Sequence, residues 1–160
     1  MKTNNIHFLP LFLLLSIFIG CKSTQGLSKE EIIQNIDNKI QEQSYVFEAD
    51  QAGPANGSII YLTSPYSLKV SPDTLIAFLP YFGRAYSAPS PMEEGGIKFT
   101  STNFDYSASD KEKGVYTISV NIKDDPNKYN LSLLIGENGK GTLHVTQMNK
   151  QSITFYGNIE

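Results

Sequence analysis

Apolar and polar side chains alternate along most of the chain from Tyr45 to the C-terminus, and this period of two limits the fold more than any other feature. Successive side chains of a β-strand point to opposite faces of a sheet, so the alternation predicts strands that each bury one face. The C-terminal part contains four such segments, at 116–122, 129–135, 143–145 and 153–159. We therefore expect a four-stranded antiparallel meander at the end of the chain.

Turn-forming residues separate these segments. The stretch from Asp124 to Asn127 contains a proline, and Asn138-Gly139 is a pair suited to a tight hairpin. Five further candidate strands precede them, at 45–50, 58–63, 67–71, 74–79 and 97–107. About eight to ten strands joined by sequential hairpins predict a mainly β domain, with an antiparallel sheet curled into a barrel or sandwich.

The segment before the first strand has helical periodicity. Ser28 and Glu31 have the spacing of a capping box, which marks a helix N-terminus. Four isoleucines then recur at helical spacing, at positions 32, 33, 36 and 40. We expect one N-terminal amphipathic helix whose isoleucine face plugs or flanks the sheet. The alternative is a helix lying on a membrane, which is disfavoured because its polar face has no cluster of Lys and Arg.

The start of the chain resembles a secretory signal. Lys2 precedes an uncharged apolar stretch from Phe8 to Ile19. This stretch is short for a membrane span and contains Pro10, so a transmembrane helix is the weaker alternative. The expected organisation is a signal peptide at 1–20, a lipidated residue with a short tether at 21–27, and one domain at 28–160.

Cys21 is the single cysteine of the chain, and it follows Phe18-Ile19-Gly20 in the manner of a bacterial lipobox. Phe18 departs from the usual Leu of that motif but keeps its apolar bulk. We expect Cys21 to be the lipidated first residue of the mature protein, which would anchor it to a membrane through acyl chains. Residues 22–25 include no acidic side chain, so neither an inner-membrane retention signal nor an acidic surface-export cluster is present. The expected location is the cell envelope, on the periplasmic face of the outer membrane.

Charge and composition argue against several functions. The formal net charge is -3, which gives no electrostatic reason to expect a nucleic-acid partner. The chain has 1 Cys and 2 His, and of the histidines only His144 follows the signal peptide, so no metal site or nucleophile–base pair is expected. No cofactor is expected either, because no glycine loop has the residues that hold a phosphate. A hydrolase that uses only carboxylates, such as Glu93-Glu94 or Asp124-Asp125, is the third-ranked function.

One dense block, Leu79-Pro80-Tyr81-Phe82-Gly83-Arg84-Ala85-Tyr86, holds the one arginine of the chain. With Asp73-Thr74 before it, Gly95 to Phe99 after it and Ile153 to Ile159 at the end, it resembles a family of Bacteroidota lipoproteins of unknown function, a DUF. The stretch 90–94 departs from the family's usual glycine-rich sequence. The resemblance covers nearly the whole mature chain. It implies a lipocalin-like β-barrel with an N-terminal helix, and it implies no activity. Asp73-Thr74-Leu75 also resembles an O-glycosylation acceptor of Bacteroidota, with Thr74 as the modified residue.

Two non-enzymatic functions fit these observations. In the first, a barrel mouth lined by Tyr and Phe binds a small apolar or amphipathic ligand. In the second, the barrel is filled by its own side chains and docks on another envelope protein. An open apolar interior favours ligand binding, and a filled interior favours docking.

The block supplies the candidate ligand-binding or structural residues, which are Tyr81, Phe82, Gly83, Arg84 and Tyr86. In an extended block, Phe82, Arg84 and Tyr86 share one face, so the guanidinium lies between two aromatic rings. There it either binds an anionic group of a ligand or holds the proline-rich loop in place. The second interpretation is favoured, and it predicts a lower melting temperature for Arg84→Lys even without a ligand.

Overall fold

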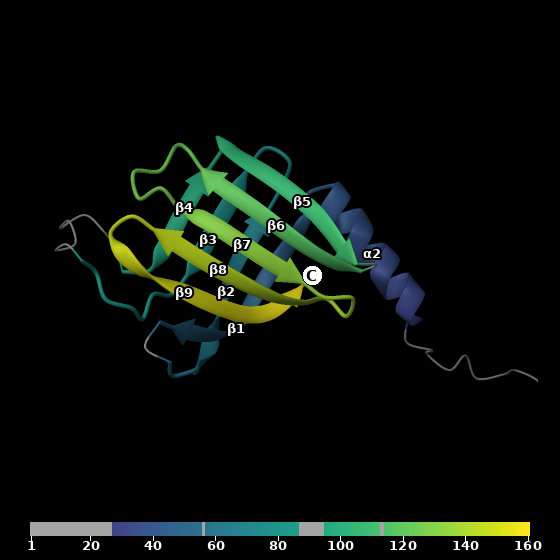
Figure 1. Ribbon diagram of the computed structural model, residues 1–160, viewed down its shortest axis with the longest axis horizontal. Coiled ribbons are helices and arrows are strands. Elements are labelled where there is room, and N and C mark those ends of the chain that lie inside the picture. The colour runs from purple at the N-terminus through teal and green to yellow at the C-terminus, as the bar shows by residue number, and fades with distance from the viewer. Residues whose placement is uncertain (1–26, 56, 87–94, 113) are drawn as a thin grey trace, which may run out of the picture.

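Nine antiparallel strands form one curled sheet, an open half-barrel with a single helix at one end, in the computed structural model of residues 27–55, 57–86, 95–112 and 114–160 (Figure 1). The elements in chain order are α2 (Lys29–Gln41), β1 (Tyr45–Pro54), β2 (Ile60–Val70), β3 (Leu75–Leu79), β4 (Ile97–Ser101), β5 (Phe104–Glu112), β6 (Val115–Ile122), β7 (Asn130–Ile135), β8 (Lys140–Gln147) and β9 (Lys150–Ile159). The expected mainly β, barrel-like fold with an N-terminal helix is confirmed.

The strand order across the sheet is β4-β3-β2-β1-β9-β8-β7-β6-β5. The first and last strands of the chain therefore lie side by side at the centre, and β4 and β5 are the two edges. The predicted C-terminal meander is present as β6 to β9. The half-barrel is open between its edge strands, because among the described strands β4 pairs with β3 alone and β5 with β6 alone.

The helix forms as the sequence predicts. Ser28 Oγ accepts a hydrogen bond from the backbone N–H of Glu31, and Glu31 Oε2 accepts one from the backbone N–H of Ser28, which completes the capping box. Ile36 and Ile40 are buried in the common core, and Ile32 packs against that core. No helix among the described residues is long and apolar enough to span a membrane. The predicted signal peptide at 1–20 and Cys21 lie outside the described residues.

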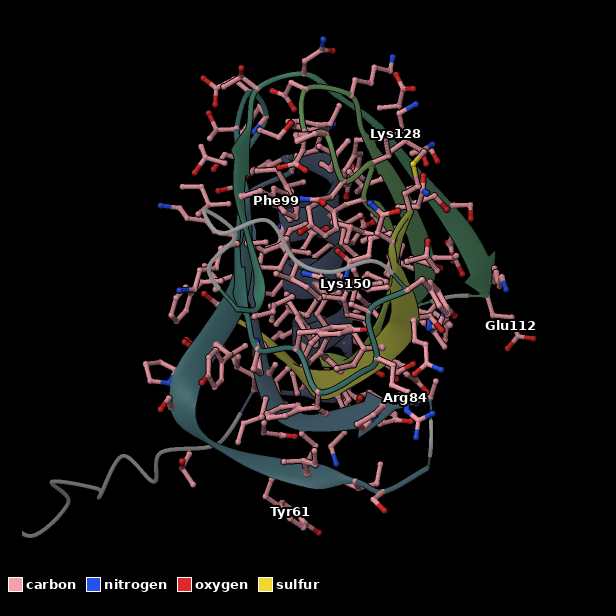
Figure 2. The ribbon with its side chains drawn as sticks, turned by 90° about the vertical axis from the view of Figure 1, so that its left-hand side faces the viewer. Tyr61, Arg84, Phe99, Glu112, Lys128 and Lys150 are labelled. Carbon is pink, nitrogen blue, oxygen red and sulfur yellow. The ribbon has the colours of Figure 1, made fainter. Side chains whose placement is uncertain are left out.

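The concave side of the sheet is filled by its own side chains (Figure 2). Twelve large side chains are less than 2 % exposed: Phe47, Phe155, Leu68, Leu75, Leu79, Ile97, Ile118, Ile135, Leu143, Ile153, Val70 and Val145. The strands are also packed closely enough that one position requires glycine. A Cβ on Gly157 would overlap the backbone of Glu48 on the neighbouring strand.

Two expected strand boundaries differ in the structure. The segments 58–63 and 67–71 belong to one strand, β2, which bends away from β1 where the register moves from Ala49↔Tyr66 to Gln51↔Tyr61. Pro65 lies within this irregular stretch, where its missing N–H costs no ladder bond. The expected strand 97–107 is instead two strands, β4 and β5, which separate at a turn and lie at opposite edges of the sheet.

Candidate functional site

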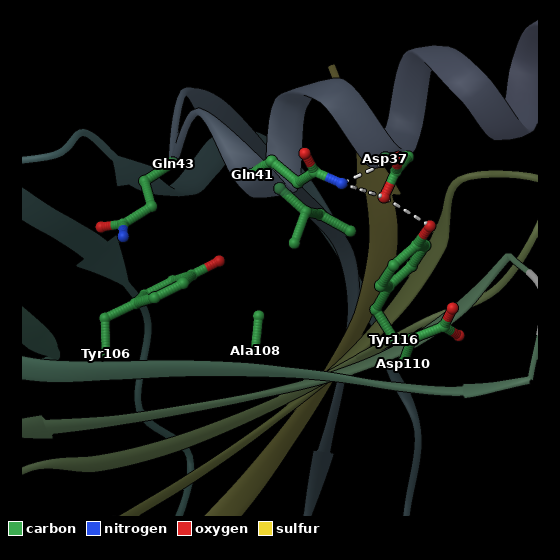
Figure 3. Close-up of a pocket in the computed structure, with 8 residues that line it drawn as sticks. Asp37, Gln41, Gln43, Tyr106, Ala108, Asp110 and Tyr116 are labelled. Carbon is green, nitrogen blue, oxygen red and sulfur yellow. Dashed lines mark hydrogen bonds between the residues drawn. The ribbon is translucent and has the colours of Figure 1, made fainter.

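A groove of about 410 Å³ lies between α2 and the edge strand β5 (Figure 3). We call it the helix groove. It is lined by Asp37, Ile40 and Gln41 of α2, Gln43 after it, Tyr106, Ala108 and Asp110 of β5, and Tyr116 of β6. Its volume is in the range of small-molecule sites, and polar groups from two separate elements converge on it.

Asp37 is the most strongly held polar group of the helix groove. Its Oδ1 accepts a hydrogen bond of 2.9 Å from the hydroxyl of Tyr116, and both of its oxygens lie 3.0 Å from Nε2 of Gln41 (Figure 3). Burial raises the pKa of Tyr116 to about 12, and the hydrogen bond to Asp37 and the negative charges of Asp37 and Asp110 add to that rise. Two carboxylates, Asp37 and Asp110, thus lie close to the Tyr116 hydroxyl in this groove.

A pair of tyrosine hydroxyls connects the groove to the core. The hydroxyls of Tyr45, on β1, and Tyr106, on β5, lie 3.3 Å apart. Burial raises the pKa of both phenols, so both stay protonated in neutral solution. The hydroxyl of Tyr106 points from β5 into the helix groove (Figure 3). The groove thus offers a fixed hydroxyl beside its carboxylates.

Strand β5 leaves the groove accessible. Ala108 and Asp110 are exposed, and the small side chain of Ala108 lies between the larger Tyr106 and Asp110 along the strand. The described lining residues include two carboxylates and neither Lys nor Arg. Within the described ranges no three His, Cys, Asp or Glu side chains are grouped so as to hold a metal ion. This arrangement suits an organic cation or a donor-rich ligand.

The predicted Tyr-Phe-Gly-Arg block has a different position, at the opposite end of the half-barrel. Residues 80–86, which we call the strap, cross from the end of β3 to the start of β9. The backbone N–H of Tyr86 donates to the carbonyl of Asn149, and that of Gln151 donates to the carbonyl of Arg84. The hydroxyl of Tyr81 lies 2.9 Å from the carbonyl of Gln151 and 3.0 Å from that of Arg84.

Gly83 fits closely in the strap, because a Cβ there would overlap the hydroxyl of Tyr81 and the Tyr81 side chain would have to move. The side chains of Phe82, Arg84 and Tyr86 are exposed. The expected stack of Arg84 between two rings does not form among the described residues; the cation over Tyr81 is Lys150, with Nζ 5.4 Å from the ring centroid. The backbone of Arg84 is held by hydrogen bonds to Gln151, whereas its guanidinium contacts no group among the described residues. The strap pairs with β9 through the single bridge between Ala85 and Lys150 and is not a full strand.

Comparison with known proteins assigns the family. The model of a domain of unknown function, DUF4251, matches residues 28–159. The chain belongs to the DUF4251 family. Its structure is similar to the crystal structure of a DUF4251 family protein from Bacteroides eggerthii, with a TM-score of 0.60 and 18% sequence identity over 80% of this chain and 86% of that one. No curated protein sequence matches this chain.

The remaining predicted residues of this DUF4251 domain are spread over the surface. Thr74 is half-buried in the turn between β2 and β3, where its carbonyl accepts a hydrogen bond from Ser71. His144 is exposed, and its Nδ1 lies 3.0 Å from Oγ1 of Thr154. Glu93 and Glu94 lie outside the described residues. None of the described ones contributes to the helix groove.

Asp124 is a structural carboxylate of this DUF4251 domain. Its oxygens accept hydrogen bonds from Ser101 Oγ and from the backbone N–H groups of Thr102 and Asn103. These bonds lower its pKa, chiefly the bond from Ser101. The neighbouring Asp125 accepts a hydrogen bond from the backbone N–H of Asn127. The pair stabilises the turns at 102–103 and 124–127.

Sequence reasoning missed the helix groove because its residues form no motif. Tyr106, Ala108 and Asp110 are two residues apart, and the strand expected from the sequence, 97–107, ends before Ala108. One signal was available: alternation weakens after Tyr106, and the rest of β5 is exposed on both faces. Where an edge strand has no buried face, the element that packs next to it does not cover it fully. Here a groove remains between α2 and the exposed part of β5.

Proposed function

We propose that this protein is a lipid-anchored, non-enzymatic binding module of the bacterial cell envelope, which holds a small organic cation in the helix groove. The observation that carries the proposal is the convergence of Asp37, Asp110 and two tyrosine hydroxyls on one accessible groove, in which no Lys or Arg is found among the described lining residues. A carboxylate attracts an ammonium group, and an aromatic ring stabilises a cation over its face.

The groove also has an apolar side. Ile40 and Ala108 lie in its lining with the rings of Tyr106 and Tyr116. An amphipathic amine, with an ammonium head and a short hydrocarbon body, matches this division better than a sugar acid or a phosphate. The expected ligand site was the mouth of the barrel, but side chains fill the concave side of the sheet. The helix groove is therefore the better supported ligand site.

The anchor is part of the same proposal. It rests on Cys21 and the apolar stretch before it, and on the amphipathic helix that begins a few residues later. Replacement of Cys21 by Ala should release the protein from the membrane fraction or block its processing. Normal processing with unchanged membrane fractionation would be evidence against lipidation.

The filled interior favours a second candidate, docking on another envelope protein. In that case the exposed surface is functional and the helix groove is a by-product of helix packing. Docking predicts a stable complex after cross-linking in cells and no specific effect of amines on the purified protein.

The proposal is tested by NMR titration with hexylammonium chloride. All described elements lie within residues 27–160, so a soluble form starting at residue 22 suffices. The expected result is saturable shifts of the amides of Asp37, Ala108 and Asp110. Asp110→Asn should weaken binding at least tenfold, whereas Asp73→Asn, a change of an exposed turn carboxylate, should leave it unchanged.

Shifts scattered over the surface, or equal effects of the two asparagine variants, would contradict the proposal. Native mass spectrometry of protein purified from its own host adds an independent readout. A co-purifying amine that is lost in Asp110→Asn would identify the ligand class.

A further inference from the structure

A row of exposed tyrosines lies on the convex face of the sheet. Gln51 of β1 is directly opposite Tyr61 of β2 on one side and Tyr156 of β9 on the other. Directly opposite residues share a face of the sheet. The next position, Ala52, is fully buried, so the row formed by Tyr61, Gln51 and Tyr156 faces outward. We call it the tyrosine row.

Both rings are accessible. Tyr61 is 77% exposed and points away from the sheet at the bottom of the view in Figure 2. Tyr156 is 37% exposed. Within the part of the chain that the structure describes, neither tyrosine hydroxyl forms a hydrogen bond. A tyrosine that neither packs in the core nor bonds through its hydroxyl contributes little to the fold.

The tyrosine row borders a groove of about 290 Å³. The groove is lined by Asp50, Gln51, Lys140, Gly141, Thr142, Tyr156, Gly157 and Asn158. It lies where the register of β1 shifts between Ala49 and Gln51 against both of its neighbours. A bulge of this kind increases the local twist and re-aims side chains, which accounts for a hollow on the convex face of a sheet.

We propose that the tyrosine row and this groove bind a neutral oligosaccharide. The flat face of Tyr156 can stack against the C–H face of a sugar ring, while the amides of Gln51 and Asn158 and the hydroxyl of Thr142 bind sugar hydroxyls. One acidic and one basic side chain, Asp50 and Lys140, line the groove, so its charge is balanced and favours neither an anion nor a cation.

The spacing of the rings sets the size of the ligand. Tyr61 and Tyr156 are on strands that flank β1, so their backbones are about 10 Å apart at the usual strand spacing. A single sugar contacts one ring, whereas a chain of two or more sugars contacts both. The site is independent of the helix groove, since the two share no residue.

The test is an NMR titration with three neutral probes, cellohexaose, maltohexaose and chitohexaose, on the soluble form starting at residue 22. We expect at least one probe to shift the amides of Gln51, Thr142 and Asn158 saturably. Tyr156→Ala should weaken that binding at least tenfold, and Tyr61→Ala should weaken it for the hexasaccharide but not for the corresponding monosaccharide.

The control is Tyr86→Ala, which removes a tyrosine on the strap that is 71% exposed, close to the 77% of Tyr61. It should leave binding unchanged. A failure of all three oligosaccharides to shift these amides would overturn the proposal. So would binding of an unglycosylated peptide to the row without any oligosaccharide binding, or equal losses in Tyr86→Ala and Tyr156→Ala.

Discussion

The two ends of the half-barrel differ in how their polar groups are used. At the strap end, the hydroxyl of Tyr81 contacts backbone carbonyls, and Asp124 accepts three hydrogen bonds that hold the turn between the edge strands. At the helix end, the hydroxyl of Tyr106 and the carboxylate of Asp110 face an accessible groove. The conspicuous sequence block thus makes its contacts with the protein's own backbone, and the candidate site consists of residues without a motif.

The largest effect is expected from the core that both ends share. Leu133 is 2% exposed, so Leu133→Ala should cost roughly 2 to 5 kcal/mol of unfolding free energy, measured by urea titration. The adjacent Ser132 faces outward, and Ser132→Ala should cost under about 1 kcal/mol. Equal losses would mean that another layer covers the convex face.

The strap should be the next most sensitive region. Gly83→Ala places a methyl group against the Tyr81 hydroxyl and should cost about 1 to 3 kcal/mol, the range for an overpacked site. Gly95→Ala is the control, since a Cβ at that position meets nothing within 4 Å. If the two variants have the same melting temperature, the strap does not depend on the contact between Tyr81 and Gly83.

Asp124→Asn should lower the melting temperature in neutral solution by less than Gly83→Ala does. The pKa of Asp124 is lowered in the folded state, so its contribution is present above the ordinary aspartate pKa of about 3.9 and is lost as pH falls through the lower folded value. The difference between wild type and variant should therefore shrink between neutral pH and about pH 3. A difference that stays constant over this range would show that the carboxylate charge is not involved.

Arg84→Lys should have the smallest effect, within about 0.5 kcal/mol, because the exposed guanidinium holds nothing in the described structure. This replaces the expectation drawn from the sequence, in which the variant melts at a lower temperature. Thermal denaturation of the ligand-free protein distinguishes the two. A clear drop in melting temperature would show that the Arg84 side chain does hold the loop in place.

The sequence predicted the parts of this molecule that follow a single period. The helix from its capping box, the strands β6 to β9 and the hairpin at Asn138-Gly139 all follow from local patterns. It did not predict that 97–107 divides into two edge strands, because the turn at Thr102 and Asn103 depends on Asp124, a residue distant in sequence. The helix groove was missed for the same reason, since α2 and β5 meet only in the folded chain.

The pairing of β1 with β9 has a consequence for how the molecule is made. Phe47 is opposite Ile159, so the central seam of the sheet joins the two ends of the domain. Such distant contacts close slowly, because a long loop must be ordered before they form. A nascent chain cannot complete this seam until its last strand has been synthesised. Truncation of the final few residues should therefore leave the first half of β1, from Phe47 to Ala49, unpaired on one side, with an open hydrogen-bonding edge prone to aggregation.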